Sequence, residues 1–251
     1  MNILDIQKKI RKIRITRVRM GWCPCCERRT LFIAIGYWLR DDYKCIWCHS
    51  IPRQRAFMKV LNERIPNYKN MEMHECSPSG VLFKKFKYND KYTFSYYWKD
   101  KTLGIKEKET GAYNQNLENM LFPDESFDVF ITQDVMEHIN NPRAAFKEIE
   151  RVLKHGGVHI FTVPLYPFIK TRPRIEVDGD KIKKILPALY HGDPVNRDGC
   201  LVTWDWGNDI TEFIKAVSDM ETEIIEFPNN KDNFWNGLEG DFLWVCVSKK
   251  K

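Results

Sequence analysis

The chain has 251 residues, of which 43% are hydrophobic and 13% aromatic, and its net charge is +6. This composition is sufficient for a packed core, so we expect a globular protein of one large domain, or of one domain with a small module. The apolar runs fall short of the roughly 20 residues that a membrane-spanning helix needs, and the basic first residues lack the apolar segment of a signal peptide. We therefore expect no membrane span and a cytoplasmic protein, of unknown oligomeric state.

The first 20 residues carry most of the excess positive charge. Seven lysines and arginines stand there against one aspartate, beside isoleucines at helical spacing. This pattern predicts a basic helix or arm over residues 1–20 that could bind nucleic acid or an anionic surface. The alternative is a solvated helix whose isoleucines pack on the body of the protein. The isoleucines are Ile3, Ile6, Ile10 and Ile13.

A cysteine-rich module follows, over residues 21–52. It contains five of the eight cysteines, which indicates metal binding rather than disulfides. Two C-x2-C pairs enclose eighteen residues, enough for a β-hairpin, and four thiolates suit tetrahedral zinc. We predict a structural zinc ribbon, with Cys25 as an alternative ligand and reduced cysteines without metal as the other alternative. The predicted ligands are Cys23, Cys26, Cys45 and Cys48.

A four-thiolate zinc site is closed, so its role would be to dock or present a substrate. Residues 53–69 are expected to form a basic helix that links the ribbon to the rest of the chain. Arg53 and Arg55 lie near the ribbon in this segment and could hold a phosphate of a nucleotide-linked or nucleic-acid substrate. The alternative is that both are ordinary solvated charges.

Residues 127–164, FDVFITQDVMEHINNPRAAFKEIERVLKHGGVHIFTVP, are typical of a βαβ unit. Residues 127–132 are an apolar, β-branched run that predicts a buried parallel strand. Asn141 can cap a helix with one apolar face, Gly156 is expected to end it, and residues 158–163 predict a second strand. Parallel sheets of this kind bind ligands at the carboxyl ends of their strands.

The segments FPDESFDVFITQDVMEHI and AFKEIERVLKHGG resemble class I S-adenosylmethionine-dependent methyltransferases of the methyltransferase type 11 kind. The resemblance covers about residues 70–165. It implies an α/β, Rossmann-like sheet, mostly parallel with the last strand antiparallel, in a domain of residues 70–251. It also implies S-adenosylmethionine as cofactor. The cysteine leader, with Arg53 and Arg55, is similar to zinc-ribbon leaders of some bacterial methyltransferases.

In this family the first strand ends in an acidic residue and a glycine-rich loop, whose amides approach the methionine carboxylate of the cofactor. The chain departs from this pattern, because Pro78 lacks an amide donor, although the hydroxyls of Ser77 and Ser79 can form hydrogen bonds. The residues at the corresponding positions are Glu75, Ser77, Pro78, Ser79 and Gly80.

The second family strand, expected at residues 92–98, usually ends in a carboxylate that accepts both ribose hydroxyls. Here Tyr96 or Tyr97 stands near that place. The resemblance then puts Asn116 and Leu117 beside the adenine. Gln133 and Asp134 follow the strand at which cofactor and substrate meet. A Rossmann-like scaffold without cofactor is the alternative.

Asp134, Glu137 and His138 lie at i, i+3 and i+4, so one helical turn would present them on the same side. Three interpretations remain open. His138 or Asp134 acts as a general base, the three side chains bind a divalent metal, or Glu137 and His138 only cap and orient the loop.

A second polar cluster lies within residues 189–210, with several aspartates, glycines and tryptophans. Polar groups on such loops often carry function. His191 is our first choice for a base on the substrate side, with Asp193 to orient it. The alternative is a turn whose aspartates and glycines serve backbone geometry, with an edge strand at residues 203–206.

These patterns predict a methyltransferase that uses S-adenosylmethionine and acts on a hydroxyl or amine of a small-molecule, sugar or nucleotide-linked acceptor, presented by the ribbon. The alternative is a zinc-ribbon nucleic-acid-binding protein on a catalytically degenerate methyltransferase scaffold, in which the basic N-terminus contacts the nucleic acid.

Overall fold

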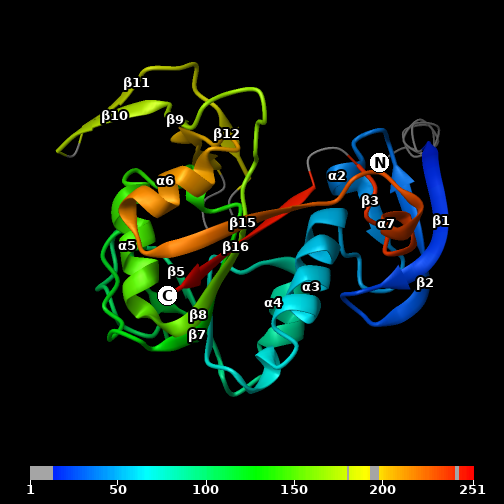
Figure 1. Cartoon of the computed structure of the whole chain (residues 1–251), viewed down its shortest axis with the longest axis horizontal. Coiled ribbons are helices and arrows are strands. Elements are labelled where there is room, and N and C mark those ends of the chain that lie inside the picture. Colours follow the sequence, from blue (N-terminus) through cyan, green and yellow to red (C-terminus); the bar gives the residue numbers. More distant parts are fainter. Residues whose placement is uncertain (1–13, 180, 193–197, 241–242) are drawn as a thin grey trace, which may run out of the picture.

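The computed structural model describes residues 14–179, 181–192, 198–240 and 243–251. Within these residues the central element is a seven-stranded sheet of order β15-β16-β8-β7-β4-β5-β6 (Figure 1). Neighbouring strands are parallel except at β16, which is antiparallel to both β8 and β15. The predicted sheet is confirmed. Its strands are β4 (Met73–Cys76), β5 (Tyr92–Tyr96), β6 (Tyr113–Asn114), β7 (Phe127–Gln133), β8 (Leu153–Thr162), β15 (Met220–Glu226) and β16 (Trp244–Lys250).

Helices cover both faces of the sheet, because successive side chains of a strand point to opposite faces. On β7, Val129 and Ile131 pack in one buried cluster with α3 and α4, whereas Phe130 packs in another with α5 and α6. The two pairs of helices lie on opposite sides of the strands (Figure 1). The helices are α3 (Pro52–Arg64), α4 (Gly80–Phe86), α5 (Pro142–Val152) and α6 (Ile210–Val217), with 3₁₀ turns η1 (Tyr68–Asn70) and η2 (Met136–His138).

Helix α5 begins as predicted but ends earlier. The side chain of Asn141 accepts a hydrogen bond from the backbone N–H of Ala144 at 3.2 Å, which caps the helix. The chain leaves the helix at Leu153, because this residue pairs with Phe127 in the sheet and is fully buried. The prediction that Gly156 ends the helix is therefore wrong: Gly156, with φ of 74°, lies within β8.

The N-terminal part forms a separate three-stranded antiparallel sheet of order β1-β2-β3, blue in Figure 1. Its elements are β1 (Ile15–Cys23), β2 (Arg28–Ile35), α2 (Leu39–Asp42) and β3 (Tyr43–Cys45). Residues 15–20 were expected in a basic helix or arm, and that prediction is wrong, because they pair with β2. Residues 1–13, which hold the isoleucines of the predicted helix, lie outside the described part of the chain.

This small sheet packs on the large one. Cys23, Phe32 and Tyr43 belong to the same buried cluster as Leu61 of α3 and Val245 of β16. Helix α7 (Lys231–Trp235) closes over β1, and a side chain on Gly21 would come within 2.1 Å of the Trp235 carbonyl oxygen. The ribbon thus folds against the sheet and α3.

Arginines of β1 are paired with a carboxylate from the far end of the chain. Arg17 and Arg19 bind opposite oxygens of the buried Glu239, at 3.0 and 2.8 Å. Arg55 of α3 is fully buried as well, and it donates to the carbonyl oxygens of Tyr43 and Gly237 at 2.9 and 2.7 Å. The prediction that Arg55 is a phosphate ligand or a solvated charge is wrong, since its guanidinium, which also donates to the Ser50 carbonyl oxygen, holds three backbone segments together.

The segment between β8 and α6 forms small hairpins beyond the sheet (Figure 1). Trp204 and Asp205 form the short strand expected at residues 203–206, and they pair with Pro173 and Arg172. Asp193 lies outside the described residues. The elements are β9 (Arg172–Pro173), β10 (Ile175–Asp178), β11 (Lys181–Lys184), β12 (Tyr190–His191), β13 (Cys200–Leu201) and β14 (Trp204–Asp205). Among the described helices, none has the length and apolar character to cross a membrane.

Candidate functional site

Two adjoining hollows lie at the carboxyl ends of β4 and β7. The larger hollow has a volume of about 580 Å³ and the smaller hollow about 340 Å³. Trp38, Arg40 and Arg53 contribute to the wall of the larger hollow, so the ribbon and α3 form one side of it. The residues that line both hollows are Ser77, Asp134, Val135, His138 and Gly192.

The predicted cofactor residues divide between those that line the hollows and those that line neither. Tyr96, Asn116 and Leu117 line only the smaller hollow, and Ser79 and Gln133 line only the larger. Ser77, Asp134 and His138 line both. The remaining three line neither hollow: Glu75 and Pro78 are buried and Gly80 is exposed.

Glu75 is fully buried on β4. Its carboxylate accepts hydrogen bonds from the Tyr92 hydroxyl and the Gln133 side-chain amide, each at 2.6 Å. Burial raises the pKa of Glu75 to about 7, against the opposing effect of the two hydrogen bonds. Its observed role is to fix Gln133 at the end of β7.

The loop after β4 is held in a strained conformation. Ser77 has φ of 51° and Gly80 has φ of 67°, both in the left-handed region. A side chain on Gly80 would come within 2.6 Å of Gln54 Nε2, and the positive φ of this residue favours glycine. The hydroxyl of Tyr96 donates to the Pro78 carbonyl oxygen at 2.7 Å and thereby fixes the loop.

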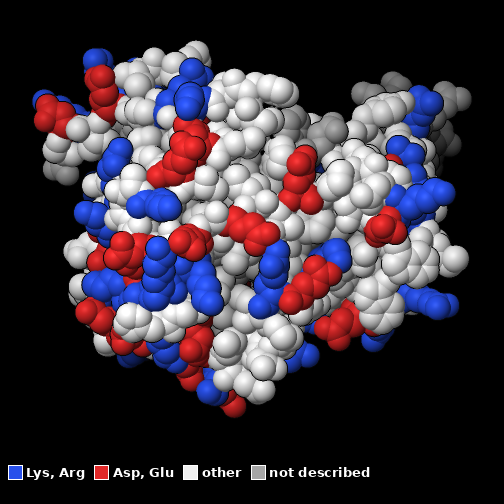
Figure 2. Space-filling view, viewed as in Figure 1, with Lys and Arg blue, Asp and Glu red and all other residues white. Residues whose placement is uncertain are grey.

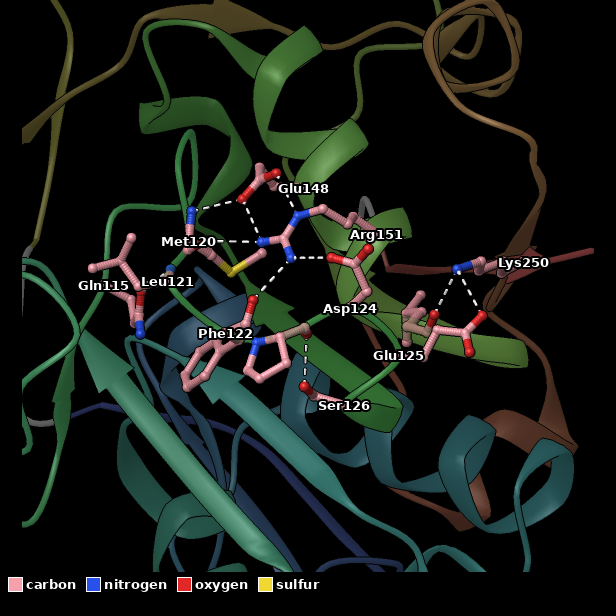
Figure 3. Close-up of polar contacts among 12 residues, drawn as sticks. Gln115, Met120, Leu121, Phe122, Asp124, Glu125, Ser126, Glu148, Arg151 and Lys250 are labelled. Carbon is pink, nitrogen blue, oxygen red and sulfur yellow. Dashed lines mark hydrogen bonds and ion pairs between the residues drawn. The ribbon is translucent and has the colours of Figure 1, made fainter.

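Arg151 of α5 stabilises the segment that follows Asn116 and Leu117 in the wall of the smaller hollow. Its guanidinium donates to the carbonyl oxygens of Met120 and Phe122 at 2.9 and 2.8 Å, and the ion pair with Asp124 adds a third contact (Figure 3). Sequence reasoning missed Arg151, although it lies within the AFKEIERVLKHGG segment.

Two asparagines shape the same wall. The side-chain oxygen of Asn116 accepts the backbone N–H of Glu118 at 3.0 Å, so one of its two acceptor sites is already used. Asn114, which sequence reasoning also missed, is buried, and its amide donates to the carbonyl oxygens of Trp98 and Lys101 at 3.0 and 2.8 Å. Asn114 thereby holds the turn after β5.

Asp134 is turned away from the cluster that the sequence predicted for it. With φ of 50°, it follows β7, and its carboxylate accepts from Arg40 at 3.1 Å, from Arg53, and from the Thr162 hydroxyl at 2.9 Å. Burial alone would raise the pKa of Asp134, but Arg53 and Arg40 outweigh burial and hold it below its usual value. Asp134 is thus an ion-pair partner, and the structure groups Glu137 and His138 with His191 instead of with Asp134. That Asp134 acts as a base stays a prediction.

His191 takes the place beside Glu137 and His138 that was predicted for Asp134. Its Nδ1 lies 3.5 Å from Glu137 Oε1, and His138 Nε2 lies 3.8 Å from the same oxygen. The two imidazole rings are 5.2 Å apart at 88°. The structure therefore brings together the two histidines that the sequence placed on different segments.

Glu137 is the most deeply buried member of this group. It is 1% exposed, and neither carboxylate oxygen has a hydrogen-bond partner. Burial raises the pKa of Glu137 above its usual value, although His191 opposes this.

The four predicted zinc ligands also come together. The sulfur atoms of Cys23, Cys26, Cys45 and Cys48 lie within 4.8 Å of one another. Cys25 points elsewhere, and its thiol lies 3.5 Å from the Gln54 carbonyl oxygen. The donor set fits a tetrahedral Zn²⁺.

One part of the chain that forms this site matches a known family. Residues 98–161 match the family described as "Methyltransferase domain". The match covers part of the wall of the smaller hollow, β7, η2 and α5, and nearly all of β8. A 54-residue stretch is 38% identical to the sarcosine/dimethylglycine N-methyltransferase of Aphanothece halophytica, which corresponds to 22% of this chain and 20% of that protein. The chain thus spans about a fifth of the length of this curated relative.

Two solved structures are similar at low identity. An S-adenosylmethionine-dependent methyltransferase from Mesorhizobium loti is 13% identical, with a TM-score of 0.48 over 78% of this chain and 98% of that one. The 1,6-didemethyltoxoflavin-N1-methyltransferase of Burkholderia thailandensis is 11% identical, with a TM-score of 0.46 over 80% of this chain and 78% of that one.

Proposed function

We propose that this protein is a methyltransferase that transfers the methyl group of S-adenosylmethionine to a hydroxyl or amine acceptor. The observation that carries the proposal is the match of residues 98–161 to a methyltransferase domain, since these residues supply β6, β7 and most of β8 and part of the lining of both hollows. The sheet order, with one antiparallel strand at β16, is the arrangement that the family resemblance implies.

The smaller hollow is our proposed cofactor site. Tyr96, Asn116 and Leu117 surround it, and Ser77 lies where it meets the larger hollow. Asn116 keeps one acceptor position for an exocyclic amine, and Leu117 offers an apolar surface to a purine. Tyr97 and Lys99 also line this hollow, in the turn that Asn114 holds.

The larger hollow is our proposed acceptor site. Its volume of about 580 Å³ falls in the range of small-molecule sites, and its wall combines Trp38, Arg40 and Tyr166. A zinc-bound ribbon would hold Trp38 and Arg40 in place, which supports the proposal that it presents a small-molecule, sugar or nucleotide-linked acceptor.

The reaction follows from this arrangement. The acceptor lone pair attacks the methyl carbon in line with its bond to sulfur, that bond breaks, and its electrons remain on the sulfur of S-adenosylhomocysteine. The acceptor proton must leave. His191 and His138 line the larger hollow and are the candidates for receiving it. Asp193, predicted to orient His191, lies outside the described residues.

Calorimetric titration with S-adenosylmethionine tests the cofactor site. We expect a dissociation constant below about 1 mM, and no heat at that concentration would contradict the proposal. Tyr97→Asp sharpens the test, because it puts a carboxylate where the family accepts the ribose hydroxyls. Charge-assisted hydrogen bonds of this kind should tighten binding about 10-fold. Tyr88→Asp is the matched control, since Tyr88 is 81% exposed and remote from the hollow, and it should leave the affinity unchanged.

The nucleic-acid alternative has less support in the described residues. Arg17 and Arg19 of the basic segment are committed to Glu239. On the face in Figure 2, lysines and arginines are interspersed with aspartates and glutamates. We therefore place the acceptor among small molecules.

A further inference from the structure

Glu137 is buried beside His138 and His191, two residues that line the larger hollow. Its carboxylate is buried, and both oxygens lack a hydrogen-bond donor. A buried carboxylate without a donor or counter-ion costs several kcal/mol, so such groups in proteins are paired or bind metals. The nearest basic atoms are the imidazole nitrogens at 3.5 and 3.8 Å, too far for good hydrogen bonds. A cation bound between these three groups would give the carboxylate the partner that it lacks.

The tautomer of His138 is set by its surroundings. His138 Nδ1 lies 2.9 Å from the Leu201 carbonyl oxygen, which can only accept a hydrogen bond. The proton is consequently on Nδ1, and Nε2, the atom nearer Glu137, carries a free lone pair. A backbone carbonyl bound to the far nitrogen is the usual arrangement for a histidine that ligates a metal.

The three ligand atoms are close enough to share one ion. One atom each from Glu137, His138 and His191 lie within 4.8 Å of one another. Two imidazoles and one carboxylate are a donor set that binds Zn²⁺, Fe²⁺ and related divalent ions and leaves coordination positions open. Asp134 does not complete the set, because Arg40 and Arg53 hold its carboxylate.

We propose that Glu137, His138 and His191 bind a divalent transition-metal ion whose open positions face the larger hollow. Binding of the ion stands on the geometry alone, and its role rests on the proposed methyltransferase function. With both histidines as ligands of the ion, neither receives the acceptor proton. An acceptor hydroxyl that coordinates the ion would instead lose its proton to solvent more readily, because a bound cation stabilises the oxyanion. The acceptor oxygen then forms the bond to the methyl carbon as the carbon–sulfur bond breaks. The site thus selects a hydroxyl acceptor that can coordinate a metal.

Metal content of the full chain tests the proposal without an assay of methyl transfer. After reconstitution with Zn²⁺ or Co²⁺ and removal of loose ions, elemental analysis should give two ions per chain, one for the four cysteines and one for this site. Glu137→Gln and His191→Ala should each lose one ion, or bind it at least 10-fold more weakly in a calorimetric titration. His155→Ala is the matched control, since this histidine is 78% exposed on the surface, and it should keep both ions.

Cobalt distinguishes the two sites by their spectra. The thiolate site gives intense ligand-to-metal charge-transfer bands, which should persist in Glu137→Gln and report that the ribbon is folded. One ion per chain in the unsubstituted protein, with no further binding of Zn²⁺, Mn²⁺, Fe²⁺ or Co²⁺ at about 1 mM, would overturn the metal site. A protein that binds the second ion but not S-adenosylmethionine would refute the proposed function and leave the metal site standing. A protein that binds S-adenosylmethionine but not the second ion would refute the metal site and leave the proposed function standing.

Discussion

Arg53, in the first turn of α3, donates to the carboxylate of Asp134, which lies 81 residues further along the chain at the end of β7. Arg40 of α2 binds the same carboxylate oxygen at 3.1 Å. Through these ion pairs, Asp134 connects α2 and α3 on one side of the larger hollow to the end of β7 on the other. All three side chains are at most 23% exposed, so solvent screens these pairs only in part.

Asp134→Asn should therefore destabilise the protein by about 1–3 kcal/mol, between the values for exposed and for fully buried pairs. Asparagine keeps the size of the side chain but leaves two partly buried guanidinium groups without a counter-charge. Urea unfolding measures the change. Glu63→Gln removes the exposed pair with Lys59 and should cost less than about 0.5 kcal/mol. An equal loss of unfolding free energy in the two variants would show that the ion pairs of Asp134 with Arg40 and Arg53 stabilise the protein no more than an exposed pair does.

The neighbouring cysteines Cys25 and Cys26 should respond differently to the same substitution. Cys26→Ser removes a member of the four-sulfur group, so we expect the loss of one zinc ion and cooperative unfolding at a lower temperature, since the ribbon and the sheet share a buried cluster. Cys25→Ser should keep the zinc and cost only about 1 kcal/mol, because the Cys25 thiol contacts the Gln54 carbonyl instead. Zinc content and thermal melting of the two variants decide the ligand. Loss of zinc from Cys25→Ser but not from Cys26→Ser would reverse the assignment.

His159 should make the stability depend on pH. Burial lowers the pKa of His159 to about 3, from 6.5 in the unfolded chain. Its contribution is fully present above pH 6.5 and is lost as the pH falls towards 3, because only the unfolded state takes up the proton in that window. The loss attributable to this residue between pH 6.5 and 5 is about 2 kcal/mol.

His159→Gln isolates this effect from that of other titrating groups. Glutamine can retain a hydrogen bond to Thr132, which contacts His159 Nε2 at 2.9 Å. We expect the difference in unfolding free energy between the unsubstituted protein and the variant to shrink when urea unfolding is repeated at pH 5 instead of pH 7. A difference that stays constant over this range would mean that His159 takes up a proton equally well in both states.

The sequence predicted what local patterns determine and missed what distant contacts determine. Asn141 and the apolar stripe of α5 were sufficient for the helix, because capping and periodicity act within a few residues. The position of β4 was also predictable from the sequence. The direction in which Glu75 points was not, because all four residues of that strand are buried and a buried strand shows no alternation of polar and apolar residues. Asp134 was assigned to the wrong cluster because its partners, Arg40 and Arg53, lie 94 and 81 residues away.

The grouping of the four cysteines, by contrast, was predicted correctly from local spacing. Their spacing alone selected Cys26 over Cys25, because two thiolates separated by two residues can turn towards one ion. The structure confirms that grouping of the sulfur atoms. His191 was singled out from its loop, but its meeting with Glu137 depends on the path of the chain between β8 and α6, which residue patterns do not encode.

Arg151 offers the most direct test of how the wall of the proposed cofactor site is held. Its guanidinium binds two carbonyl oxygens and the carboxylates of Asp124 and Glu148, which fixes residues 120–124 behind Asn116 and Leu117 (Figure 3). Arg151→Lys retains the charge but not the planar fork, so it cannot make these contacts together. We expect about a 10-fold loss of affinity for S-adenosylmethionine, with a smaller loss of stability than in Arg151→Ala. Calorimetry and urea unfolding measure the two quantities. Lys147→Ala, on the exposed face of the same helix, should change neither. If Arg151→Lys binds the cofactor as tightly as the unsubstituted protein, the wall is ordered by its own packing and the clamp serves stability alone.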